Sequence, residues 1–155
     1  MNLNAEYINP FLEAASIVFK SILNIMLRRG KLAVKDNTKP SMEIAIIIGI
    51  EGGIKGQVVY SMDFDMIRKI ADVLMPGISD EQLKEEYADI IGEIANMITG
   101  NAMNLLSTTN KVIDITTPAV VNVKDVGNEQ FISQTTIGIM LYGSIGQLEL
   151  NIALS

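Results

Sequence analysis

The sequence predicts an α+β protein in which two long helices and one short helix pack on a mostly antiparallel sheet of about six strands. Two segments, 5–27 and 80–108, carry apolar residues at helical spacing. The segments that follow them alternate between apolar and polar residues or are rich in β-branched residues, and Gly, Pro and Asn separate them. Because each half contains a long helix that is followed by strands, we expect two pseudo-repeated halves.

The first half is expected to open with the helix 5–27, for which Gly30 is a plausible stop. Pro10 falls inside this segment and marks either the first turn of the helix or a kink. Arg28 and Arg29 would then follow the helix and complement the negative end of its dipole. The strands expected next are 31–36, 42–50 and 54–62, and the last two form a hairpin that turns at Gly52-Gly53.

The second half is expected to begin with a short helix, 63–75, which Pro76-Gly77 ends. Ser79 and Gln82 then form a capping box, which opens the long helix 80–108. Alternating segments predict the remaining strands, 112–116, 119–124, 130–141 and 145–154.

An internal similarity supports the repeat. Residues 51–60 and 142–150 both contain a Gly-marked turn followed by Gly-Gln and an alternating strand, and Glu13-x-x-Ser16 in the first helix corresponds to Glu93-x-x-Asn96 in the second. Two unrelated hairpins would share some of these features, so one sequence gives the duplication limited support.

Composition restricts the function. The chain has 155 residues, of which 48% are hydrophobic, and this predicts one domain over residues 1–155. A net charge of −6 argues against nucleic acid as a partner. The absence of Cys and His excludes disulfides, thiol nucleophiles, Ser-His-Asp catalysis and the usual zinc ligand sets. No signal peptide is expected, and the longest aliphatic run, Ile44 to Ile48, is too short to cross a membrane, so a bacterial cytoplasmic location without membrane contact is expected.

The long second helix has an unusual polar face. A rotation of 100° per residue places one apolar group together as the buried face: Tyr87, Ile91, Ile94, Ile98, Ala102 and Leu105. It places a polar group together on the other side: Glu86, Asp89, Glu93, Asn96, Gly100 and Asn104. A solvated face is the ordinary explanation. This one, however, contains no Lys or Arg from residue 85 to 110. Ile90 and Met97 are expected to flank it and not to face the core, so a partner-binding surface is the alternative.

The pattern Asp89-x-x-x-Glu93-x-x-Asn96, with Pro118 in the following strand region, resembles the signature of the CheC/CheX/FliY phosphatase family of bacterial chemotaxis. The expected order of helices and strands also agrees, so the resemblance covers essentially the whole chain. CheC-type members tend to carry two such helices and CheX-type members one. Because the first helix has Ser16 where an Asn would be needed, the chain is more similar to the CheX type, with one active centre and a vestigial Glu13.

The resemblance implies hydrolysis of the aspartyl phosphate of a CheY-like response regulator. In this scheme Asn96 orients the attacking water and Glu93 pairs with a Lys of the regulator. Asp89 would aid docking, with Ile90, Met97 and Gly100 as further partner contacts, and Pro118 would shape the neighbouring loop. The chain itself would need no cofactor or metal, because Mg²⁺ would belong to the regulator.

The resemblance also implies a homodimer paired through sheet edges, against the alternative of a monomer with a short, blunted edge strand. Two other functions remain open. The same fold could be a non-catalytic module that docks a response regulator or a receptor-modifying enzyme. A small-ligand sensor has less support, because no Gly-rich phosphate loop is present.

Overall fold

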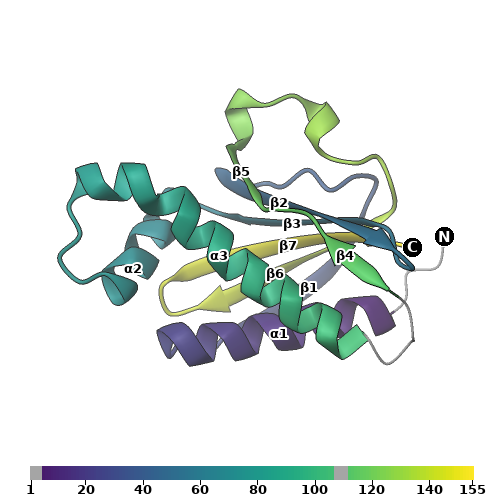
Figure 1. Ribbon diagram of the computed structural model, residues 1–155, viewed down its shortest axis with the longest axis horizontal. Coiled ribbons are helices and arrows are strands. Elements are labelled where there is room, and N and C mark those ends of the chain that lie inside the picture. Colours follow the sequence, from purple (N-terminus) through teal and green to yellow (C-terminus); the bar gives the residue numbers. More distant parts are fainter. Residues whose placement is uncertain (1–4, 107–111) are drawn as a thin grey trace.

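The computed structural model describes residues 5–106 and 112–155 (Figure 1). The α+β class is confirmed, and its elements are α1 (Ala5–Leu23), β1 (Arg28–Lys35), β2 (Ile44–Gly52), β3 (Gly56–Met62), α2 (Phe64–Leu74), α3 (Asp80–Leu106), β4 (Ile113–Ile115), β5 (Ala119–Asn122), the 3₁₀ turns η2 (Val123–Asp125) and η3 (Asn128–Gln130), β6 (Thr136–Gly143) and β7 (Gly146–Leu154).

The strands form one antiparallel sheet in the order β1-β6-β7-β3-β2-β4. β5 also pairs with β2, at residues 44–47, whereas β4 pairs with residues 50–52. The sheet therefore has seven strands in the described part of the chain, one from each of the seven segments predicted as strands. β1 from the first half pairs with β6 from the second, and β4 and β5 pair with β2, so the two halves interlock.

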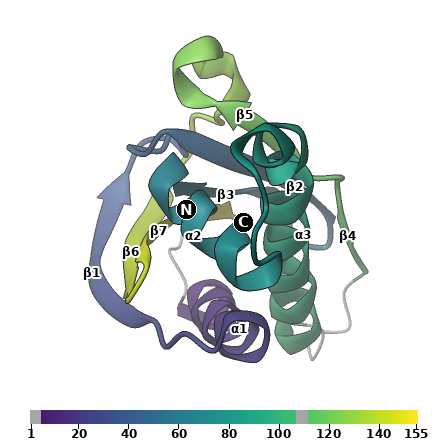
Figure 2. The same ribbon diagram turned by 90° about the vertical axis from the view of Figure 1, so that its left-hand side faces the viewer.

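The helices lie on one face of the sheet, which curves around them (Figure 2). α1 and α3 pack side by side, with α2 across one end (Figures 1 and 2). The main core lies between helices and sheet, and it is filled by large apolar side chains such as Phe11, Phe19, Ile46, Ile67 and Leu150. Burial of this apolar surface is the main force that fixes the long helices on the sheet.

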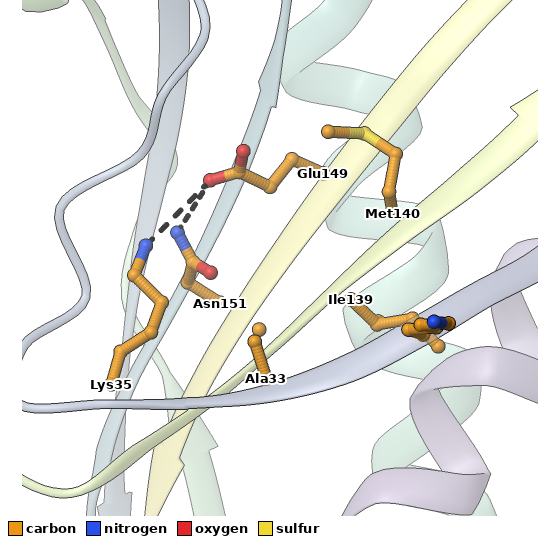
Figure 3. Close-up of a pocket in the computed structure, with 8 residues that line it drawn as sticks. Ala33, Lys35, Ile139, Met140, Glu149 and Asn151 are labelled. Carbon is orange, nitrogen blue, oxygen red and sulfur yellow. Dashed lines mark hydrogen bonds and ion pairs between the residues drawn. The ribbon is translucent and has the colours of Figure 1, made fainter.

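The outer face of the sheet is covered in part by loops. Phe131 from the segment before β6 packs on Ala45, Ile47 and Val59, and this makes a second, smaller core. Beside it lies a shallow pocket of about 180 Å³ over β1, β6 and β7. Here the side chains of Lys35 and Asn151 both point toward the carboxylate of Glu149 (Figure 3).

The carboxylate of Glu149 has a structural role on this outer face. It accepts a hydrogen bond from the backbone N–H of Ser41 at 3.1 Å and another from the Ser41 hydroxyl. The amide of Asn151 donates to Glu149 at 2.8 Å and to the carbonyl of Thr38 at 3.2 Å. These buried bonds hold the connection 36–43 against the sheet.

The first helix ends earlier than the sequence predicted. Asn24 has a φ of 55°, a left-handed conformation that Asn tolerates and that terminates helices. Its N–H still donates to the carbonyl of Lys20 at 3.1 Å, and the Lys20 ammonium donates to the Asn24 side chain at 2.8 Å. Helix α1 thus stops at Leu23, with Pro10 inside it. Placing Arg28 and Arg29 at a helix end was wrong, because both residues, like Gly30, belong to strand β1.

One further boundary differs from the prediction. The segment 130–141 is not one strand, because the 3₁₀ turn η3 precedes β6, which begins only at Thr136. The end of the long helix predicted at 107–108 lies outside the described residues. Leu105, predicted to be buried, is 41% exposed, while Met103 and Leu106 are buried in its place.

The register of the central strands supports the pseudo-repeat. Aligning Gly56-Gln57 with Gly146-Gln147 also aligns Tyr60 with Leu150. In the sheet, Tyr60 and Leu150 are direct partners across the antiparallel pair β3 and β7. These two equivalent residues therefore face each other, as expected at the axis of a two-fold relation between the halves.

Candidate active site

Helix α3 carries the candidate site, and its start is fixed by local bonds. The predicted capping box is present: the N–H of Gln82 donates to the Ser79 hydroxyl at 3.1 Å, and the N–H of Ser79 donates to the Gln82 side chain at 3.3 Å. Arg68 of α2 donates to the carbonyl of Ile78 at 2.8 Å and lies 3.2 Å from the carboxylate of Asp80. The first turn of α3 is thus tied to α2.

The apolar side of α3 fixes the direction of its polar side. Ile91, Ile94, Ile98 and Ala102 are buried as predicted. Tyr87 is half-buried, and its ring contacts Phe64 edge-on at a centroid distance of 5.4 Å. Because a helix cannot rotate without exposing this apolar side, the polar residues are held at a fixed orientation.

The polar side of α3 borders an open groove of about 320 Å³. Its lining includes Asp89, Glu93, Asn96 and Pro118, the four residues of the predicted signature. Asp89 and Glu93 are exposed, and Asn96 is half-buried. The structure therefore brings the predicted catalytic residues together on one accessible surface.

The opposite wall of the groove is the segment that leads into β5. Gly92 forms the floor, and a Cβ at that position would lie 3.6 Å from Val120 and 3.8 Å from Pro118, so helix and wall are in close contact. The wall is held to β2 by Thr116, whose N–H donates to the carbonyl of Gly49 at 2.9 Å and whose hydroxyl accepts from the N–H of Gly49 at 2.8 Å.

The groove is acidic. Within the part of the chain that the structure describes, neither Asp89 nor Glu93 forms an ion pair, and neither they nor Asn96 form a side-chain hydrogen bond. Two uncompensated carboxylates in one groove produce a negative potential that favours an approaching cation. The amide of Asn96 adds a neutral group that both donates and accepts hydrogen bonds.

Three predicted partner contacts lie outside the groove. Ile90 and Met97 are partly buried and pack against the main core, so the prediction that they do not face the core was wrong. Gly100 is open, and no atom lies within 4 Å of a Cβ built there. Whether these residues touch a partner stays a prediction.

Sequence reasoning missed three residues of the groove: Ala88, Gly92 and Thr117. Ala88 and Gly92 precede Asn96 at helical spacing, so the wheel that grouped the polar residues could have included them. Thr117 precedes Pro118, and only the return of the chain to the sheet places it opposite Asn96. On the first helix, Glu13 and Ser16 are exposed and do not belong to this lining.

Among residues 5–106 and 112–155, no group of three or more acidic, His or Cys side chains is arranged to hold a metal ion. No helix in those ranges has the length and apolar character needed to span a bilayer.

The fold and groove together define a CheC-like protein. A CheC-like superfamily protein from Shewanella sp. PV-4 is 29% identical, with a TM-score of 0.82 over 99% of both chains. A sequence profile described as chemotaxis phosphatase CheX matches residues 44–136, more than half of the chain. The chain therefore belongs to the chemotaxis phosphatase CheX family.

Two further relatives carry functional descriptions. The CheY-P phosphatase CheX of Thermotoga maritima is 29% identical over 129 residues, which cover 83% of each chain. The CheX of a CheX–CheY–BeF₃–Mg²⁺ complex from Borrelia burgdorferi is 27% identical, with a TM-score of 0.78 over 96% of this chain and 97% of that one.

Proposed function

We propose that this chain is a phosphatase that accelerates hydrolysis of the aspartyl phosphate of a CheY-like response regulator. The observation that carries the proposal is that Asp89, Glu93, Asn96 and Pro118 line one open groove in a member of the CheX family. The relatives support the reaction and the partner, because one is a CheY-P phosphatase and another is complexed with CheY.

Asn96 is the proposed catalytic residue. An aspartyl phosphate is reactive, so a phosphatase mainly needs to hold a water in line with the phosphorus, opposite the aspartyl oxygen. The Asn96 amide can hold that water by a hydrogen bond without adding negative charge. The water adds to phosphorus, the bond from phosphorus to the aspartyl oxygen breaks, and the products are the free Asp carboxylate and dihydrogen phosphate.

Glu93 is the proposed anchor. It lies one helical turn before Asn96 in the same groove and has no cationic partner among the described residues. A Lys of the regulator that pairs with this carboxylate would fix how deeply the helix inserts. Asp89, one further turn away, adds to the attraction for such a cation and aids docking.

The metal is proposed to belong to the regulator. Mg²⁺ is part of the Borrelia complex, and the phosphoryl charge needs a cation that this acidic groove does not provide. We therefore assign no cofactor to this chain.

The direct test is to mix the purified chain with a panel of phosphorylated receiver domains and follow release of inorganic phosphate. The proposed phosphatase activity is supported if at least one regulator releases phosphate faster in the presence of the chain and is recovered without its phosphoryl group. Binding of a phosphorylated regulator without faster release would instead identify the non-catalytic docking module.

A homodimer is proposed through strand β1. It is the last strand of the sheet on its side, and Leu32 and Val34 are 59% and 68% exposed there, which a monomer would leave in water. Arg28, Arg29, Lys31 and Lys35 on the same strand would repel a second copy, so pairing should strengthen with salt. Light scattering measures the mass in solution. A mass of twice 16.9 kDa for the unaltered chain, together with 16.9 kDa for Val34→Lys, supports the dimer. A mass of 16.9 kDa for the unaltered chain at all concentrations and salt levels contradicts it.

The proposed compartment is the cytoplasm, on account of the membership in a chemotaxis family. Cell fractionation with an antibody against the chain tests this location.

A further inference from the structure

The groove beside α3 contains few groups that can donate a hydrogen bond. Among the residues that the structure describes, its lining consists of Ala88, Asp89, Gly92, Glu93, Asn96, Thr117 and Pro118. Ionised carboxylates only accept, and Ala, Gly and Pro have no polar side chain. The two lining side chains that carry a donor are therefore Asn96 and Thr117.

The Thr117 hydroxyl is available to an incoming group. Thr117 is exposed, and within the described ranges its side chain makes no hydrogen bond, in contrast to the neighbouring Thr116. A donor without an internal partner on the wall of an acidic groove is suited to an anionic oxygen brought in by another molecule.

The backbone on both sides of Thr117 is fixed, which keeps its hydroxyl in place. On one side, Thr116 is bonded to Gly49 through its N–H and its side chain. A Cβ at Gly49 would lie only 3.0 Å from the Thr116 methyl group, so the glycine permits this close approach. On the other side, Pro118 restricts its own φ and the conformation of Thr117 before it. Pro118 also lies beside Gly92 of α3.

We propose that Thr117 is a second substrate-contacting residue, whose hydroxyl donates a hydrogen bond to an oxygen of the phosphoryl group on the regulator. This inference rests on the proposed function. Asn96 is occupied with the attacking water, so Thr117 is the side-chain donor that remains for the phosphoryl oxygens. Its contact offsets the repulsion between those oxygens and the carboxylates of Asp89 and Glu93.

The test compares Thr117→Val, which keeps the shape and removes the donor, with Thr117→Ser, which keeps the donor. Thr135→Val is the matched control, because this Thr lies outside the groove lining. Turnover is measured with saturating phosphorylated regulator. Affinity is measured for the regulator with Mg²⁺ alone and with Mg²⁺ and BeF₃⁻.

For Thr117→Val we expect turnover to fall on the order of tenfold to a hundredfold, the value of one hydrogen bond to a charged group. Affinity for the BeF₃⁻ form should fall, while affinity for the Mg²⁺ form stays unchanged. Thr117→Ser and Thr135→Val should behave like the unaltered chain.

Two results overturn the assignment. Unchanged turnover and affinity in Thr117→Val would remove the residue from the site. Equal losses of affinity for both regulator forms would mean that Thr117 contacts the regulator's protein surface and not the phosphoryl group. The unaltered chain and an Asn96→Ala variant, measured alongside, separate the two proposals. If the unaltered chain does not accelerate phosphate release, the proposed function fails. If it does and only Asn96→Ala is inactive, only the role of Thr117 fails.

Discussion

The hydroxyl groups of Tyr60 and Thr99 lie 2.8 Å apart in the main core, between the central strand β3 and helix α3. The Thr99 hydroxyl also lies 2.8 Å from the carbonyl of Ala95, and because its single proton goes to that carbonyl, Tyr60 is the donor to Thr99. Thr99 follows Asn96 by about one turn, so this bond fixes the part of the helix that carries the proposed catalytic amide.

Tyr60→Phe should lower the free energy of unfolding by about 1 kcal/mol at neutral pH, the usual net value of a buried hydrogen bond. Burial raises the pKa of Tyr60 above its ordinary value. As pH rises past about 10, the unfolded chain releases this proton before the folded chain does, so stability falls by up to about 1.4 kcal/mol per pH unit.

Urea unfolding of both proteins from pH 8 to 11.5 measures the effect. The unaltered chain should lose stability more steeply above pH 10 than Tyr60→Phe, because the variant lacks this proton. Tyr142→Phe is the control, since that ring is 37% exposed. Parallel curves for the unaltered chain and Tyr60→Phe would contradict the raised pKa.

Asn96→Ala should slow stimulated dephosphorylation. The lower rate should correspond to a loss of about 2–4 kcal/mol of transition-state stabilisation, as expected for one positioned group. The fold should be retained, because the Asn96 side chain makes no hydrogen bond within the described ranges. Phosphate release and circular dichroism measure the two effects. Asn101→Ala is the matched control: it is an exposed amide on the same helix, outside the groove lining, and should keep full activity.

Glu93→Ala should weaken binding of the regulator as well as turnover, because it removes the proposed partner of a regulator Lys. Titration with the regulator bound to BeF₃⁻ and Mg²⁺ measures the affinity. Glu85→Ala removes the same charge from an exposed position outside the groove lining and should have little effect. If both variants bind equally well, Glu93 is not the anchor.

Two substitutions at Gly100 test stability and regulator binding separately. Gly100→Ala should stabilise the free chain by about 0.8–1.0 kcal/mol, because Gly disfavours a helix interior and no atom would clash with the new Cβ. The longer Gly100→Gln should also fold, yet lower the affinity for the regulator at least tenfold if the regulator covers this position. Unchanged affinity would place Gly100 outside the interface. Thermal unfolding and titration provide the two measurements.

The rate should change little between about pH 6 and 8. The chain contains no His, the one side chain whose unperturbed pKa lies in that range. Phosphate release at saturating regulator, measured at several pH values, tests this expectation. A steep change that persists with a second regulator of different sequence would require an ionising group in this chain.

Local patterns in the sequence were sufficient for much of the fold. Apolar spacing predicted both long helices, and the Gly-marked turns predicted the β2–β3 and β6–β7 hairpins, because these features depend on neighbouring residues. Ser79 and Gln82 predicted the start of α3 for the same reason. The end of α1 was missed, since it depends on the left-handed backbone of Asn24 and not on the glycine that follows later.

The candidate site also has features that the sequence predicts and features that depend on the tertiary structure. Helical spacing by itself determined that Asp89, Glu93 and Asn96 share one face, because residues three and four apart on a helix are neighbours. Only the tertiary structure decided that this face borders a groove and that Thr117 and Pro118 form its opposite wall. The physical reason is that the wall is the segment between β4 and β5. The pairing of these strands with β2 is set by long-range hydrogen bonds and burial that no local pattern specifies.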